Sequence, residues 1–217
     1  MATATAIAPI VCLLACAALL AAEWRRWPLG RAGFKLLAST AFVAFALQLG
    51  ALASAYGRWI LTALALSWIG DALLLSRQSR RFLAGLASFL LAHVAFALAF
   101  AQRPLDPAML ALALVAMGGF GGGVLAWLWR HLSTPFYRIA VAAYVLAIVA
   151  MGAFAIAASA AAGTWPLAAG AATFAASDLA VARDRFVAPG FVNRAWGLPL
   201  YYAAQLMLAA SVAGAAA

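Results

Sequence analysis

Long apolar stretches alternate with short polar connections along the whole chain. A helix needs roughly 20 mostly apolar residues to cross a hydrocarbon core about 30 Å thick. Backbone groups find no hydrogen-bond partners in lipid, and no stretch shows the alternation of a barrel strand, so the spans are expected to be helical. The pattern predicts an all-α, polytopic bundle of eight transmembrane helices that forms one domain, residues 1–217. The predicted spans are approximately 5–22, 36–54, 59–75, 82–101, 108–127, 139–158, 164–182 and 195–214.

The basic residues predict the direction of these helices. Of the 14 Lys and Arg residues, only Arg58 and Arg103 fall in even-numbered connections. The odd-numbered connections hold Arg25, Arg26, Arg31, Lys35, Arg77, Arg80, Arg81, Arg130, Arg138, Arg183, Arg185 and Arg194. Because basic connections stay in the cytoplasm, both termini are predicted on the non-cytoplasmic side. The first span is expected to be retained rather than cleaved, since basic residues follow it and none precedes it.

Composition narrows the class of protein further. Hydrophobic residues make up 69% of the chain and charged residues 9%, which excludes an ordinary soluble domain. The two cysteines, Cys12 and Cys16, exclude a disulfide scaffold, and with His93 and His131 they are too few for a Cys- or His-rich metal site. The net charge of +9 does not indicate a nucleic-acid partner, because the basic residues are separated by apolar runs.

Two acidic residues lie inside predicted spans, where a charge costs roughly 2.5–3.5 kcal/mol on insertion scales. Asp71 is near the end of the third span and Asp178 near the end of the seventh. Both spans run toward the cytoplasm, so the two carboxyls are predicted at a similar depth, roughly 6 Å inside that boundary. A matched pair of this kind suits acid–base hydrolysis, in which one carboxyl is protonated and the other ionised.

A structural explanation for the aspartates is also open. Each can pair with a nearby arginine, such as Arg77 for the third span and Arg183 for the seventh. Glu23, Asp106 and Asp184 fall in connections, where we expect them to be solvated.

Further polar residues are predicted on the same side. His93 lies near the middle of the fourth span, where a histidine side chain either acts as a ligand or forms a hydrogen bond that joins two helices. Tyr201, Tyr202 and Gln205 share the start of the eighth span, and Gln205 is three or four residues from either tyrosine, so it can share a face with each. Asn193 precedes that span and is a candidate for contact with a lipid headgroup.

Lys35 is the only lysine and is predicted to open the second span at the interface. There it could bind a lipid phosphate. The alternative is that Lys35 is an ordinary basic residue of a cytoplasmic connection.

Several short motifs follow one another in a fixed order along the chain. They are Leu66-Ser67-Trp68-Ile69-Gly70-Asp71, Phe82-Leu83-Ala84-Gly85-Leu86, Ala92-His93, Ala176-Ser177-Asp178, Arg185-Phe186 and Tyr201-Tyr202-Ala203-Ala204-Gln205. This ordered set resembles the YhhN-like family of membrane proteins, which includes lysoplasmalogenases, and the resemblance covers most of the chain, from the second predicted span to the eighth. Where the family often has Lys-Pro at the second span, this chain has Lys35-Leu36.

The resemblance implies an eight-span hydrolase that cleaves the vinyl ether bond of a lysoplasmalogen to a fatty aldehyde and a glycerophospho-alcohol. It implies Asp71 and Asp178 as the catalytic pair and no metal or organic cofactor. The other candidate residues would bind substrate or water, and they are Lys35, Ser67, His93, Ser177, Asn193, Tyr201, Tyr202 and Gln205. The partner is then a lysophospholipid drawn from the bilayer, and the alanine-rich composition suggests a bacterial inner membrane, with the site toward the cytoplasmic leaflet.

Two other functions fit the same residues. A transporter or lipid-binding membrane protein would use the aspartates to carry protons or bind a cation. A hydrolase of another lysolipid would keep the fold and change the substrate. An aspartyl protease of the membrane is not favoured, because Trp68 stands where its Gly-x-Gly-Asp motif needs a glycine.

Overall fold

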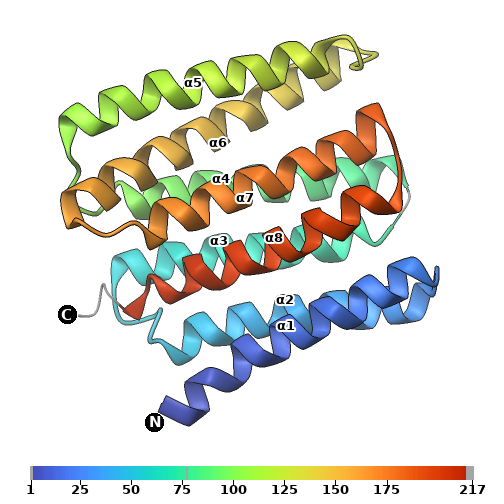
Figure 1. Cartoon of the computed structure of the whole chain (residues 1–217), viewed down its shortest axis with the longest axis horizontal. Helices are drawn as coiled ribbons and strands as arrows, with labels where there is room; N and C mark the ends of the chain where they lie inside the picture. Colours follow the sequence, from blue (N-terminus) through green and yellow to red (C-terminus); the bar gives the residue numbers. More distant parts are fainter. Residues whose placement is uncertain (1, 77, 214–217) are drawn as a thin grey trace.

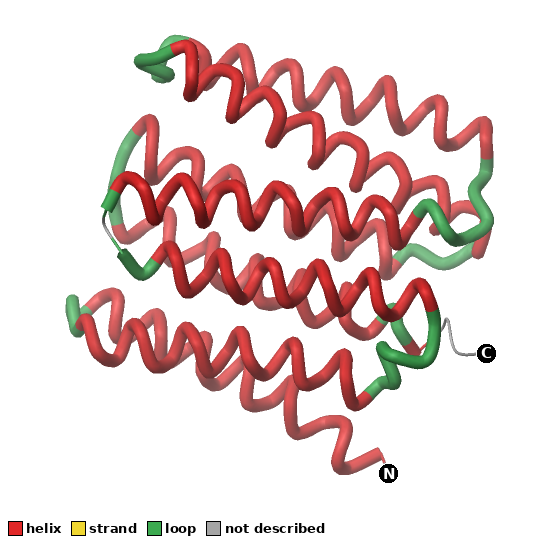
Figure 2. Tube along the Cα trace, turned by 180° about the vertical axis from the view of Figure 1, so that it is seen from behind, coloured by secondary structure: helices red, strands yellow, loops and turns green. Residues whose placement is uncertain are grey.

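The computed structural model describes residues 2–76 and 78–213, and these residues form eight α-helices, one π-helical turn and no strand. In order they are α1 (Ala2–Trp24), α2 (Pro28–Gln48), α3 (Ala55–Leu74), α4 (Ser79–Phe100), α5 (Pro107–Trp129), α6 (Pro135–Ala162), α7 (Pro166–Ala182), η1 (Arg183–Val187) and α8 (Phe191–Ala210). The helices lie side by side with their connections gathered at two ends of the bundle (Figures 1 and 2). The all-α prediction is confirmed.

Local sequence signals explain where the helices begin. Proline occupies the first turn of α2, α5, α6 and α7, where its missing N–H costs nothing. Side chains also cap three helices, because Ser54, Asp106 and Thr134 accept hydrogen bonds from backbone N–H groups three residues later. α6 ends at Gly163, whose left-handed φ of 65° suits glycine.

Five helices are long and apolar enough to cross a membrane, namely α1, α2, α4, α5 and α6. Their outer faces expose large apolar side chains, including Val115 (75% exposed), Ile139 (71%) and Leu146 (68%). Such a surface is suited to lipid. α3 and α8 carry more polar residues, and α7 has only 17 residues. That these three helices cross the membrane therefore remains a prediction.

One span limit was wrong in a way that matters for the site. The second span was predicted at 36–54, but α2 begins at Pro28 and ends at Gln48, where the chain turns through Gly50 with a φ of 80°. Lys35 therefore lies inside α2 and does not open it. The predicted end of the eighth span, residue 214, lies outside the described residues.

The packing leaves a polar space between the middle helices. α1 pairs with α2 and α5 pairs with α6 at opposite edges, while α3, α4, α7 and α8 lie between them (Figure 1). Two close approaches tighten this centre: a Cβ on Gly70 would lie 2.6 Å from the Phe89 ring, and one on Gly197 would lie 2.5 Å from the Cβ of Ala180. α3 packs on α4 and α7 packs on α8, so the aspartate-bearing helices face each other across a cavity.

Candidate active site

A polar cavity of about 480 Å³ opens among α1, α2, α3, α4, α6, α7, η1 and α8. Asp71 and Asp178 both line it, together with Lys35, Ser177, Asn193 and Tyr201. Its outer part lies among the ends of α1, α3 and α7, where the odd-numbered connections gather. The structure thus brings the two aspartates of distant helices to one cavity.

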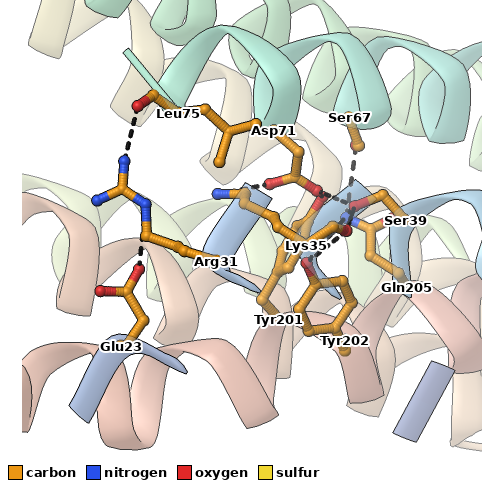
Figure 3. Close-up of polar contacts among 10 residues, drawn as sticks. All are labelled: Glu23, Arg31, Lys35, Ser39, Ser67, Asp71, Leu75, Tyr201, Tyr202 and Gln205. Atoms are coloured by element: carbon orange, nitrogen blue, oxygen red, sulfur yellow. Dashed lines mark hydrogen bonds and ion pairs between the residues drawn. The ribbon is translucent and has the colours of Figure 1, made fainter. Parts of the chain in front are cut away.

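Asp71 is buried at 2% exposure and receives hydrogen bonds or charge from three side chains (Figure 3). The ammonium of Lys35 lies 3.1 Å from Oδ1. The hydroxyl of Ser39 donates to Oδ2 at 2.6 Å, and the hydroxyl of Tyr201 donates to the same oxygen at 2.7 Å. Every one of these partners offers a proton, so the surroundings match an ionised carboxylate.

A second set of contacts holds the Asp71 partners in place (Figure 3). Tyr202 donates to the carbonyl oxygen of Lys35 at 3.3 Å, and its hydroxyl lies 3.5 Å from that of Ser39. Ser39 also lies 3.0 Å from the same Lys35 carbonyl. Deeper in the bundle, the amide of Gln205 donates to the hydroxyl of Ser67 at 3.4 Å. The candidates Tyr202, Gln205 and Ser67 therefore support the Asp71 side without lining the cavity.

Asp178 has different partners. The phenol of Tyr144 donates to Oδ1 at 3.1 Å, and Nε2 of His93 lies 3.0 Å from Oδ2. His93 is fully buried and stacks on Phe174, with 4.3 Å between ring centroids. Its ring is thus fixed in orientation by packing.

The hydrogen bonds of His93 determine where protons must be. Its Nδ1 lies 2.7 Å from the carbonyl oxygen of Phe89, which can only accept, so Nδ1 carries a hydrogen. Within the described chain, the buried atoms His93 Nε2 and Asp178 Oδ2 make no hydrogen bond, although they lie 3.0 Å apart. A contact of 3.0 Å between them therefore needs one further proton, carried by the imidazole or by the carboxyl. We call His93 and Asp178 the His–Asp pair.

Ion pairs surround the mouth of the cavity. Glu23 pairs with Arg31 at 3.7 Å and with Arg194 at 3.0 Å, and Arg194 also reaches Asp184 at 3.5 Å. Asn193 donates to Asp184 at 3.1 Å. The expectation that Glu23 and Asp184 are simply solvated was wrong, because α8 returns to the end of α1 and supplies arginine partners.

Among the described residues, neither aspartate pairs with an arginine. Asp71 pairs with Lys35, Asp178 lies beside His93, and Arg183 donates to the Asn193 side chain. Arg77 lies outside the described residues. Ser177 lines the cavity, and its hydroxyl donates to the carbonyl of Phe174. In the described part of the chain, no three His, Cys, Asp or Glu side chains gather at one point.

Sequence reasoning missed two partners of the aspartates. Ser39 lies one helical turn after Lys35, so the same helix face was a signal for it. Tyr144 carries a hydroxyl group inside an otherwise apolar predicted span, as Tyr201 does, and that position was a signal for it. Arg185, which lines the cavity beside Asp178, was quoted in a family motif and counted among the basic connections, but it was not predicted as a site residue.

These features define a polytopic helical membrane protein in which two aspartates of distant helices line one cavity. Residues 30–212 match the YhhN family, and the chain belongs to that family. It is 36% identical over 160 residues to a lysoplasmalogenase of Mycobacterium bovis, and this alignment covers 70% of this chain and 59% of that protein. It is 37% identical over 158 residues to one of Bos taurus, and 35% identical over 156 residues to one of Homo sapiens.

The alignment with the bovine protein covers 70% of this chain and 64% of the relative, and that with the human protein covers 72% and 64%. The chain thus spans about three fifths of the length of these curated relatives. No solved structure matches it.

Proposed function

We propose that the protein is a membrane-embedded hydrolase that cleaves the vinyl ether bond of lysoplasmalogens. The observation that carries the proposal is the contrast between the two aspartates in one cavity. Asp71 contacts the proton donors Lys35, Ser39 and Tyr201, whereas Asp178 Oδ2 lies 3.0 Å from the buried Nε2 of His93, a contact that needs one further proton. The relatives named lysoplasmalogenase support the same substrate class.

The chemistry of a vinyl ether requires this contrast. The bond breaks after a proton adds to the vinyl carbon farther from oxygen, which leaves an oxocarbenium ion at the carbon bonded to oxygen. Water adds to that carbon and loses a proton, giving a hemiacetal. In the hemiacetal the hydroxyl group loses its proton and becomes the aldehyde carbonyl, the bond to the glycerol oxygen breaks, and that oxygen takes up a proton. One molecule of water is consumed, and the acid regains its proton, as in glycoside hydrolysis by two carboxyl groups.

From their contacts we assign a different role to each of the two aspartates. The His–Asp pair holds the proton that the vinyl carbon receives, so Asp178 is the general acid and His93 is a positioning residue that restores the proton. Asp71 remains ionised beside Lys35, Ser39 and Tyr201, and its carboxylate stabilises the oxocarbenium ion and directs water to it.

A direct test measures aldehyde release by purified protein in detergent from a 1-alkenyl lysophospholipid. The acyl and saturated-ether counterparts of the same chain length serve as substrate controls. We expect aldehyde from the vinyl ether alone, and none from the Asp71→Asn/Asp178→Asn double variant. Fatty acid release from the acyl lipid would assign a different lysolipid hydrolase. Lipid-coupled proton uptake into liposomes without bond cleavage would assign a transporter.

The second part of the proposal concerns orientation, with the cavity open to the cytoplasmic leaflet of the cell membrane and both termini outside. It is supported by the arginine-rich connections at the mouth of the cavity. In a Cys12→Ala/Cys16→Ala background, Gln102→Cys and Ser133→Cys place single thiols at exposed positions at opposite ends of the bundle. With a membrane-impermeant maleimide on spheroplasts, we expect Gln102→Cys to react at once and Ser133→Cys only after permeabilisation. The reverse order would refute the orientation.

A further inference from the structure

A second cavity of about 80 Å³ adjoins the polar one and is almost entirely apolar. It lies between α5, α6 and α7, and its walls include Met117, Ile148 and Ala175. Tyr144, Asp178 and Arg185 line both cavities, so the two spaces meet at the carboxyl of Asp178. We call the second space the apolar groove.

Arg185 differs from the other cations that line the polar cavity. Arg31 and Arg194 are paired with Glu23, and Lys35 is paired with Asp71. Among the described residues, no carboxylate lies within ion-pairing distance of Arg185; instead its guanidinium stacks on the Phe82 ring at 4.0 Å from the centroid. Stacking holds a guanidinium in place while leaving its N–H edge free for an anion.

We propose that the apolar groove holds the single alkyl chain of the lipid substrate and that Arg185 binds its phosphate. This inference rests on the proposed hydrolase function and identifies how its substrate binds. An alkenyl lysophospholipid carries one apolar chain, a scissile bond and a phosphate in that order, and the joined cavities offer an apolar wall, Asp178 and an unpaired guanidinium. Arg185 follows Asp178 by seven residues, roughly 10 Å along a helix, a span that a glycerol phosphate bridges approximately.

The same placement accounts for which aspartate gives the proton. The vinyl carbon that receives the proton is one atom farther along the chain than the carbon that becomes cationic. Asp178 lines the groove as well as the polar cavity, whereas Asp71 lines the polar cavity alone. With the alkyl chain in the groove, the vinyl carbon farther from oxygen lies at Asp178, and the vinyl carbon bonded to oxygen lies toward Asp71.

The phosphate site is tested by binding, which does not depend on catalysis. A saturated 1-O-hexadecyl lysophospholipid cannot be cleaved, and 1-O-hexadecylglycerol is the same lipid without phosphate. We expect Arg185→Gln to weaken binding of the phospholipid about 10-fold or more and to leave binding of the glycerol ether unchanged. Arg138→Gln is the matched control, because Arg138 also stacks on an aromatic ring, that of Trp129, but lines neither cavity. Equal affinities for the phospholipid in wild type and Arg185→Gln would overturn the phosphate site.

The groove is tested by chain length. Ile148 lies one helical turn beyond Tyr144 on α6, so Ile148→Phe narrows the groove away from its mouth. We expect this variant to lower the ratio of kcat/KM for a 16-carbon over an 8-carbon alkenyl chain at least 10-fold. Leu146→Phe, at an exposed position of the same helix, should keep the wild-type ratio.

An unchanged ratio in Ile148→Phe would refute the groove while the hydrolase stands. Absence of aldehyde from the wild-type protein would refute the hydrolase, and the binding comparison would still decide on Arg185. The two failures are therefore distinguishable.

Discussion

Replacing Asp178 by Asn is expected to lower aldehyde release from an alkenyl lysophospholipid by about a thousandfold, within the range for loss of a general acid. An amide keeps the shape of the side chain and its hydrogen bond to Tyr144, but it cannot give a proton to carbon. The measurement is kcat/KM for aldehyde release by the detergent-solubilised protein. Asp106→Asn is the matched control, because Asp106 caps α5 outside the cavity and Asn caps a helix equally well.

The carbon that receives the proton can be read from the product. In D₂O the wild-type protein should release an aldehyde with one deuterium on the carbon next to the carbonyl, and variants of the His–Asp pair then test which group supplies it. His93→Gln restores a hydrogen bond to Asp178 but cannot pass on a proton, so it should remain at least 10-fold below wild type and change the pH profile of kcat. Full activity in His93→Gln, or an Asp178→Asn variant within 10-fold of wild type, would contradict the assignment of the acid.

Much of the fold could be predicted because hydropathy and length are local properties. Each predicted span corresponds to one helix, and Asp71 and Asp178 stood out as carboxyls inside apolar stretches. The limits of α2 were harder, since Pro28 starts that helix before the apolar run begins, and Lys35 therefore lies inside the helix and not at its start.

Partners could not be predicted in the same way, because they come together only in the packed bundle. Glu23 and Arg194 are 171 residues apart, yet they form an ion pair because α8 packs on α1. The partner of Lys35 also depends on packing. Its sequence position suggested a lipid phosphate as a partner, whereas in the bundle its ammonium lies beside Asp71 on α3. Among the described cations that line the polar cavity, Arg185 is the one without an ion pair, and its motif Arg185-Phe186 did not indicate this.

Replacing Lys35 by Met is expected to destabilise the protein by about 3 kcal/mol or more and to abolish aldehyde release. The change leaves the Asp71 carboxylate, with 3% of its side chain exposed, facing only the neutral hydroxyls of Ser39 and Tyr201. Removing one partner of a buried ion pair is costly because the remaining charge stays desolvated. Asp71→Asn should cost less stability, since the Lys35 side chain is 14% exposed and can extend its ammonium into the cavity.

The double variant Lys35→Met/Asp71→Asn separates stability from catalysis. With both charges removed, most of the lost stability should return, whereas activity should remain at least a thousandfold below wild type because no carboxylate is left to stabilise the oxocarbenium ion. The thermal unfolding midpoint and aldehyde release are measured on the same detergent preparations, with Arg25→Met as the control for losing an exposed cation at the same end of the bundle. A Lys35→Met variant with the midpoint and activity of wild type would show that the ion pair does not hold Asp71 for catalysis. Recovery of the midpoint without recovery of activity would instead establish that Asp71 is kept charged, at a cost in stability, for the reaction.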